Sequence, residues 1–280
     1  MRQPGNILDA LVHSVSAERL LKDPAATGEG VRIAVIDTGI ERAVLEEQAR
    51  RRQHELVPIE GGIFSPGHAE PLPYTGRQSS PHGTTVADII LTLAPRAQLY
   101  SADVFGARAG SDVESVIHAI AWSVHTWHCK VINLSLGVTE SQLAALTRRQ
   151  RLQHAIEDAY YHDVIVFAAA HNDHPHEQSY PAAFAPPLLS VDKGNFPDAY
   201  QFAYELNHGI EFQAHARGYL GPFANEPATS WAAPHLAGIV ARLLSLRPGL
   251  KPFEVKTLLY WMFSEGDNRS ARRPPEQDKQ

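Results

Sequence analysis

The sequence has little cysteine, no long apolar run and no dense positive charge, and each absence excludes a class of protein. The single cysteine, Cys129, excludes an intramolecular disulfide framework and a cysteine-rich zinc site. No segment approaches the ~18 apolar residues of a membrane span, so we expect no membrane partner. The net charge is −6, and the most basic stretch, residues 50–52, is more typical of a solvated helix end than of a phosphate-binding patch. We therefore expect no nucleic-acid partner.

The first residues also lack the features of an export signal. Residues 1–13 contain no uninterrupted apolar core and no cleavage signal. A lone cysteine suits a reducing compartment. Together these two observations predict a cytoplasmic protein.

What is present is the composition of an ordinary globular protein, with 44% hydrophobic and 20% charged residues. Short apolar runs predict buried strands, and apolar spacings of three and four residues predict helices between them. The expected strands are residues 31–36, 98–104, 130–135, 163–169 and 188–191, and the expected helices are residues 112–127, 141–161, 229–246 and 252–263.

This alternation predicts an α/β fold, a mostly parallel sheet with helices on both faces. Such sheets place their chemistry beyond the carboxyl ends of the strands. Residues 59–81 are rich in glycine, proline and serine and are expected to form a surface loop. We expect one domain over residues 1–264 and a disordered tail over residues 265–280.

Three polar residues stand where apolar elements stop. Asp37 follows the first strand, His82 lies in a cluster of small residues, and Ser230 opens a helix whose amides would face a developing negative charge. Each alone has an ordinary explanation: a turn residue, one of 15 histidines, or a helix cap. Together they supply the acid, base and nucleophile of acyl transfer.

The blocks around these residues resemble the signature blocks of the subtilisin-like serine proteases. Residues 35–39, 82–87 and 229–238 occur in that family's order of Asp, His and Ser. Residues 131–137, and residues 166–172 followed by 180–182, match two secondary blocks, so the resemblance covers about residues 17–262. It implies a three-layer subtilisin-like fold and a serine endopeptidase that needs no cofactor.

By this resemblance, Ser230 attacks the scissile carbonyl, His82 is the general base and Asp37 holds the imidazole in the right tautomer. Asn172 falls where the family keeps its oxyanion amide, although it could instead be a loop residue that satisfies local backbone. The secreted family members carry a signal and a propeptide, and the roughly 30 residues before the first strand here are too few for both.

The resemblance also implies that the substrate is a polypeptide bound as an added strand. Ser135, Leu136 and Gly137 resemble the segment that pairs with it, and Gly110 falls near the opposite edge. The pocket for the residue before the scissile bond should involve residues 135–137 together with Ala169, Ala170 and His171.

Several positions depart from the family's pattern. Ala228 stands for the usual glycine before Thr-Ser, which matters if that site needs a positive φ. Trp231 stands for the usual methionine and His171 for the usual glycine before the oxyanion amide. These three departures motivate an alternative function, a pseudoprotease that binds extended peptides without cutting them.

We expect no metal ion. The helix after His82 runs directly into residues 93–97, without the family's usual calcium-binding loop. Residues 171–177 hold three histidines, but their spacing and Pro175 do not fit a helical His-x-x-x-His pair. A cytoplasmic protease must also limit its own damage, so we expect narrow specificity, a protein partner or an activating signal. Trimming of leader peptides and activation of a defence partner both fit the sequence.

Overall fold

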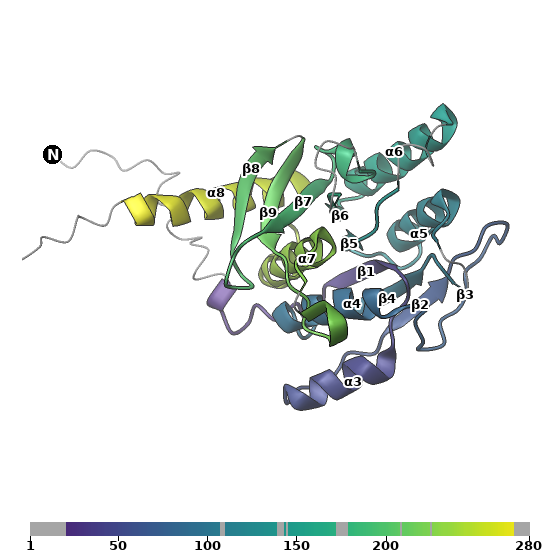
Figure 1. The fold of residues 1–280 in the computed structure, drawn as a ribbon, viewed down its shortest axis with the longest axis horizontal. Coiled ribbons are helices and arrows are strands. Elements are labelled where there is room, and N and C mark those ends of the chain that lie inside the picture. Colours follow the sequence, from purple (N-terminus) through teal and green to yellow (C-terminus); the bar gives the residue numbers. More distant parts are fainter. Residues whose placement is uncertain are drawn as a thin grey trace, which may run out of the picture.

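The computed structural model contains a nine-stranded, mostly parallel sheet in the order β3-β2-β4-β1-β5-β6-β7-β9-β8 (Figure 1). It describes residues 21–106, 110–138, 143, 145–171, 179–207, 209–224 and 226–271. The strands are β1 (Arg32–Asp37), β2 (Glu60–Ile63), β3 (Leu72–Pro73), β4 (Gln98–Asp103), β5 (Val131–Leu134), β6 (Ile165–Ala169), β7 (Leu189–Gly194), β8 (Phe202–Asn207) and β9 (Ile210–His215). Only β3 and β8 pair antiparallel to their neighbours.

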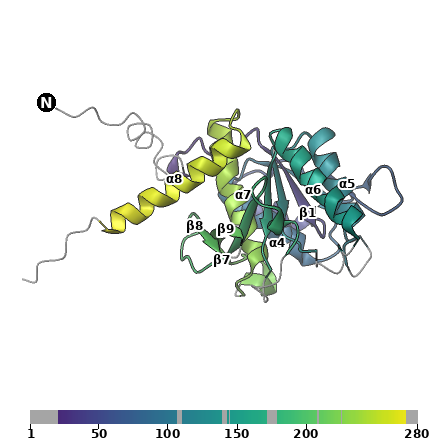
Figure 2. The same cartoon turned by 90° about the horizontal axis from the view of Figure 1, so that it is seen from above.

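Helices cover both faces of this sheet. The main helices are α3 (Arg42–Arg51), α4 (Pro81–Leu93), α5 (Val113–His125), α6 (Leu146–Tyr161), α7 (Thr229–Leu246) and α8 (Pro252–Ala271). In β1, Ile33 and Val35 join the core that includes α4 and α7, whereas Ala34 and Ile36 join the core that includes α5 and α6. Figure 2 shows α7 on one side of the sheet and α5 and α6 on the other. This alternation gives the three layers that the sequence predicts.

The five predicted strands and four predicted helices are present, with ends that shift by a few residues. The loop predicted over residues 59–81 is wrong in part, because β2 and β3 lie within it and extend the sheet. The hairpin of β8 and β9 was not expected. The tail was predicted to begin at residue 265, whereas α8 continues to Ala271; residues 272–280 lie outside the described residues. Among the described helices, none is long and apolar enough to cross a membrane.

A buried ion pair joins α3 to α4. Arg52, the C-cap of α3, places its two terminal nitrogens 2.8 and 2.9 Å from the two carboxylate oxygens of Asp88 on α4. The Asp88 side chain is fully buried, and burial raises its pKa although Arg52 opposes the shift. Arg50 and Arg51 instead pair with Glu47 at the surface, as expected for a solvated helix end.

Replacing Arg52 by alanine should lower the free energy of unfolding by about 3 kcal/mol at neutral pH, because Asp88 would be left as an uncompensated buried charge. The loss should shrink at acid pH, where the folded variant takes up the proton more readily than the unfolded chain does. Urea unfolding at both pH values measures this. Arg51→Ala is the matched control, and its exposed pair should contribute a few tenths of a kcal/mol. Equal losses for the two variants would contradict the prediction.

Candidate active site

The site lies at the carboxyl edge of the parallel sheet, around the end of β1. Asp37 is the last residue of β1, which runs between β4 and β5. Its side chain is 1% exposed. The strand therefore places the Asp37 carboxylate at the carboxyl edge of the sheet, where the active sites of parallel α/β proteins usually lie.

His82 reaches this carboxylate from the first turn of α4. The His82 ring Nδ1 lies 2.8 Å from Asp37 Oδ1 and 3.0 Å from Oδ2. Ser80 caps the helix, with its side chain accepting from the His82 amide, and Pro81 occupies the first helical position, where its missing N–H costs nothing. The sequence around His82 therefore fixes both the start of the helix and the direction of the imidazole.

Small residues allow α4 to approach β1 this closely. A Cβ atom added to Gly83 would lie 2.3 Å from the carbonyl oxygen of Gly39, which no side chain tolerates. Gly39 itself has a φ of +81°, a conformation that glycine adopts without cost. Thr38 links the two segments, since its hydroxyl accepts from the Gly83 amide at 2.9 Å and its own amide donates to Asp37 Oδ1 at 2.7 Å. The Asp37 carboxylate is thus held by more than the histidine.

Burial and Asp37 act in opposite directions on His82. Burial lowers the pKa of the imidazole, but the negative charge of Asp37 and its hydrogen bond raise it more, so the pKa of His82 lies above the ordinary value of 6.5. Two aromatic rings border the imidazole: the Trp231 ring centroid lies 4.8 Å away at a 37° tilt, and Phe223 approaches edge-on at 6.3 Å. Both rings limit the solvent around the imidazole.

Ser230 lies in the first turn of α7, next to the end of β5. Its hydroxyl donates to the Ser135 carbonyl over 3.4 Å, and the Ser135 hydroxyl donates to the Ser230 carbonyl at 2.9 Å. Thr229 anchors the same turn to the residue after β6 through a 2.7 Å bond from its hydroxyl to the Ala170 carbonyl. Among the described contacts of Ser230, none is a hydrogen bond to the His82 ring. The structure therefore brings Asp37 and His82 into direct contact, and it places Ser230 on α7, the helix that packs against α4.

Comparison with known proteins agrees with this arrangement. The sequence profile of the subtilase family matches residues 28–273. This chain belongs to the subtilase family.

Subtilisin Savinase from Lederbergia lenta is 30% identical to this subtilase over 249 residues, covering 83% of each chain. M-protease from Shouchella clausii (strain KSM-K16) is also 30% identical over 249 residues, and the match covers 83% of this chain but 59% of that relative. A solved lanthipeptide protease superposes with a TM-score of 0.63 at 20% identity, over 89% of this chain and 86% of that one. At that identity the likeness establishes the shared fold.

The Ala228 departure has no structural cost in this subtilase. Ala228 has φ −142° and ψ 152°, an extended conformation open to any residue, so the expected strain at this position is absent.

Trp231, which stands for the family's usual methionine, is buried against His82. It is 3% exposed, its indole N–H donates to the Glu226 carbonyl at 3.1 Å, and its ring packs against the His82 ring. The sequence marked Trp231 only as a replacement and did not predict this contact.

The predicted substrate segments lie at the ends of adjacent strands. Ser135, Leu136 and Gly137 follow β5, and Ala170 and His171 follow β6, its parallel neighbour. Ala169, the last residue of β6, is 3% exposed and packs in the core. Gly110 is exposed just before α5. Asn172 and the rest of the histidine-rich segment through residue 178 lie outside the described residues.

Beyond Ser230, α7 carries a buried histidine to which the sequence assigned no role. His235 is fully buried, with Nδ1 2.6 Å from the Trp231 carbonyl and Nε2 2.7 Å from the Tyr219 hydroxyl. Burial lowers the pKa of His235 to about 3. The hydrogen bond to the Trp231 carbonyl opposes this shift, whereas the charge of nearby His215 adds to it. A neutral ring that donates from Nδ1 and accepts from Tyr219 fits both contacts, and it holds the start of α7 without adding charge.

Proposed function

We propose that this subtilase is a serine endopeptidase that hydrolyses peptide bonds through an acyl-enzyme. Ser230 is the nucleophile, His82 the general base and Asp37 the residue that orients the base. The observation that carries the proposal is the bond of His82 Nδ1 to both oxygens of buried Asp37, at the sheet edge where Ser230 opens α7. The family match and the relatives named as proteases support the same activity.

The direction of the imidazole supports these roles. With Nδ1–H donated to Asp37, Nε2 is the nitrogen left to take the Ser230 proton. The hydrogen bond from the Ser230 hydroxyl to the Ser135 carbonyl is long at 3.4 Å and therefore weak. Rotation about the Ser230 Cα–Cβ bond, which would turn the hydroxyl toward His82, breaks this bond at little cost in energy. His82 then returns the proton to the leaving amine, and a water molecule repeats the cycle on the acyl-enzyme.

Charge on the tetrahedral intermediate needs preorganised donors. The Ser230 amide belongs to the first turn of α7, where N–H groups have no acceptor within the helix and the helix dipole favours negative charge. We assign Asn172 as the second donor because of its place after β6 in the matched family block. Loss of such a donor typically lowers kcat by about 10²- to 10³-fold.

The substrate in this proposal is an extended polypeptide lying along residues 135–137. The described backbone–backbone hydrogen bonds outside helices and strands involve Val138, which bridges Tyr180, but neither Leu136 nor Gly137. In this proposal, the added strand pairs with the backbone groups of Leu136 and Gly137. Backbone pairing constrains shape more than sequence, so selectivity would come from the segments around Gly110 and His171 or from a protein partner.

We further propose that the enzyme processes selected substrates in the cytoplasm. Its lone cysteine, Cys129, is buried and is not part of any disulfide, which is compatible with a reducing compartment. The structural likeness to a lanthipeptide protease makes a modified-peptide precursor a reasonable first substrate to test. A peptide-library cleavage profile would identify the preferred residues.

A fluorophosphonate probe tests the nucleophile directly. The full chain should be labelled on one serine, identified as Ser230 by peptide mapping, and Ser230→Ala should remain unlabelled. Ser65→Ala, which changes a serine in the β2–β3 connection, is the control and should label like the parent chain. A folded parent chain that resists the probe in the absence of peptide, and that separately leaves a bound peptide intact, would overturn the proposal in favour of a pseudoprotease.

A further inference from the structure

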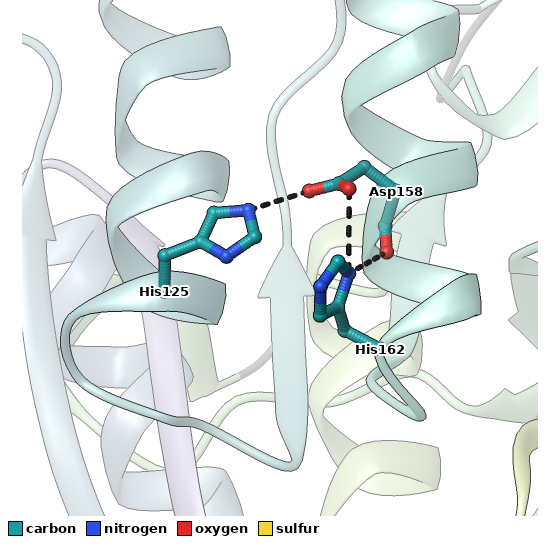
Figure 3. A group of neighbouring side chains, drawn as sticks. All are labelled: His125, Asp158 and His162. Atoms are coloured by element: carbon teal, nitrogen blue, oxygen red, sulfur yellow. Dashed lines mark hydrogen bonds and ion pairs between the residues drawn. The ribbon is translucent and has the colours of Figure 1, made fainter.

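Three side chains that suit metal ions gather on the surface away from the catalytic residues. They are His125, Asp158 and His162, from the facing ends of α5 and α6 (Figure 3). Both helices lead into strands at the amino edge of the sheet, opposite the edge that carries Asp37. The cluster therefore belongs to neither the catalytic site nor the predicted substrate segments.

The carboxylate of Asp158 lies between the two imidazoles. His125 Nε2 is 2.7 Å from Asp158 Oδ2, and His162 Nδ1 is 3.3 Å from Asp158 Oδ1. The two rings meet edge-on with centroids 4.7 Å apart. One nitrogen from each histidine and one oxygen from the aspartate all lie within 4.8 Å of one another.

The helix ends add a second reason for a cation to bind here. His125 is the last residue of α5, Asp158 lies in the last turn of α6, and His162 is the C-cap of α6. Both helices therefore end at the cluster, where the helix dipole places partial negative charge. This field adds to the full negative charge of the aspartate.

The donor set selects the kind of cation. Two imidazoles and one carboxylate suit zinc and neighbouring transition metals, whereas calcium and magnesium prefer sites made of oxygen alone. We propose that His125, Asp158 and His162 bind one zinc-type divalent ion, with water in the fourth position, and that the ion links α5 to α6.

Small side-chain movements would complete the site. Ligands about 2.1 Å from a tetrahedral ion lie about 3.4 Å apart. The widest pair of ligand atoms must therefore close by at most about 1.4 Å, and His125 Nε2 and Asp158 Oδ2, now 2.7 Å apart, must separate slightly. The three side chains are between 42% and 51% exposed, which leaves them free to rotate. His162 Nδ1 is also 2.8 Å from the Asp158 carbonyl, and the ring must give up this bond if Nδ1 becomes the ligand.

Zinc binding to the untagged full chain tests the proposal, with Ser230→Ala as the background to prevent self-cleavage. One zinc ion per chain should be retained after desalting, and a zinc excess of about 100-fold over Kd should raise Tm by roughly 5 °C or more. Calcium at the same concentration should leave Tm unchanged.

The variants separate this cluster from the other histidines. The double change His125→Ala with His162→Ala should abolish both the retained zinc and the Tm rise, while His154→Ala, an exposed histidine on α6 outside the cluster, should keep both. Each single change to glutamine should weaken zinc binding at least tenfold and leave the metal-free Tm within a few degrees, since exposed pairs contribute little to stability. No zinc-dependent shift in the parent chain, or an equal shift in the double variant, would overturn the proposal.

Discussion

Replacing His82 by alanine should reduce kcat on a peptide substrate on the order of 10⁶-fold, a loss that Ser230→Ala should match. Ser230 has no other described base to accept its proton, and the Asp37 carboxylate is already engaged by Thr38 and the imidazole. Steady-state hydrolysis of a chromogenic peptide measures kcat, and KM should change little because the imidazole is not proposed to hold the ground-state substrate.

A second measurement distinguishes a catalytic unit from separate contributions. The double variant His82→Ala with Ser230→Ala should be no slower than either single variant, because residues that act as one unit lose their effect together. His154→Ala is the control for loss of a histidine and should retain full activity. Additive losses in the double variant, or a His82→Ala enzyme within tenfold of the parent, would contradict the assigned roles.

Replacing Asp37 by asparagine should lower kcat by about 10⁴-fold while keeping the shape of the site. The amide favours the wrong imidazole tautomer and cannot stabilise the imidazolium that forms when Ser230 reacts. It should also change the pKa of His82. Burial lowers that pKa and Asp37 raises it, so removing the Asp37 charge should bring the pKa from above 6.5 to below it.

The sign of this shift sets the pH profile. In the parent chain, activity should fall as pH drops through the raised pKa of His82, because the protonated ring cannot accept the serine proton. NMR titration of the His82 ring in both proteins measures the pKa without relying on the residual rate. Asp158→Asn, which removes an aspartate bonded to histidines at the other edge of the sheet, should leave the His82 titration unchanged. An unchanged pKa in Asp37→Asn would refute the electrostatic account.

The sequence predicted the central strands well and the edges poorly. Strands such as β1 and β6 are short apolar runs buried on both faces, a pattern typical of parallel strands that helices cover on each side. The hairpin of β8 and β9 instead mixes apolar Tyr204 and Phe212 with polar neighbours, as strands at a sheet edge do. Gly209, with a φ of +85°, marks the turn between them and was the available signal.

The site residues were predictable by type and order, but their surroundings were not. The contact of Trp231 with His82 depends on how α4 packs on α7, which residue spacing does not encode. The same holds for His125, which lies 33 positions from Asp158 in the chain and meets it only because α5 packs beside α6. Long-range packing of this kind needs coordinates.

The extended backbone at Ala228 bears on how relatives of this chain are recognised. The dihedral angles there suit any residue, so the glycine common in the family before Thr-Ser is not required by the geometry of the turn. A signature pattern that demands glycine at this position, or methionine in place of Trp231, would pass over chains with an intact Asp37–His82 pair and a serine at the helix start. Searches that weigh the three-dimensional arrangement should recover such divergent members.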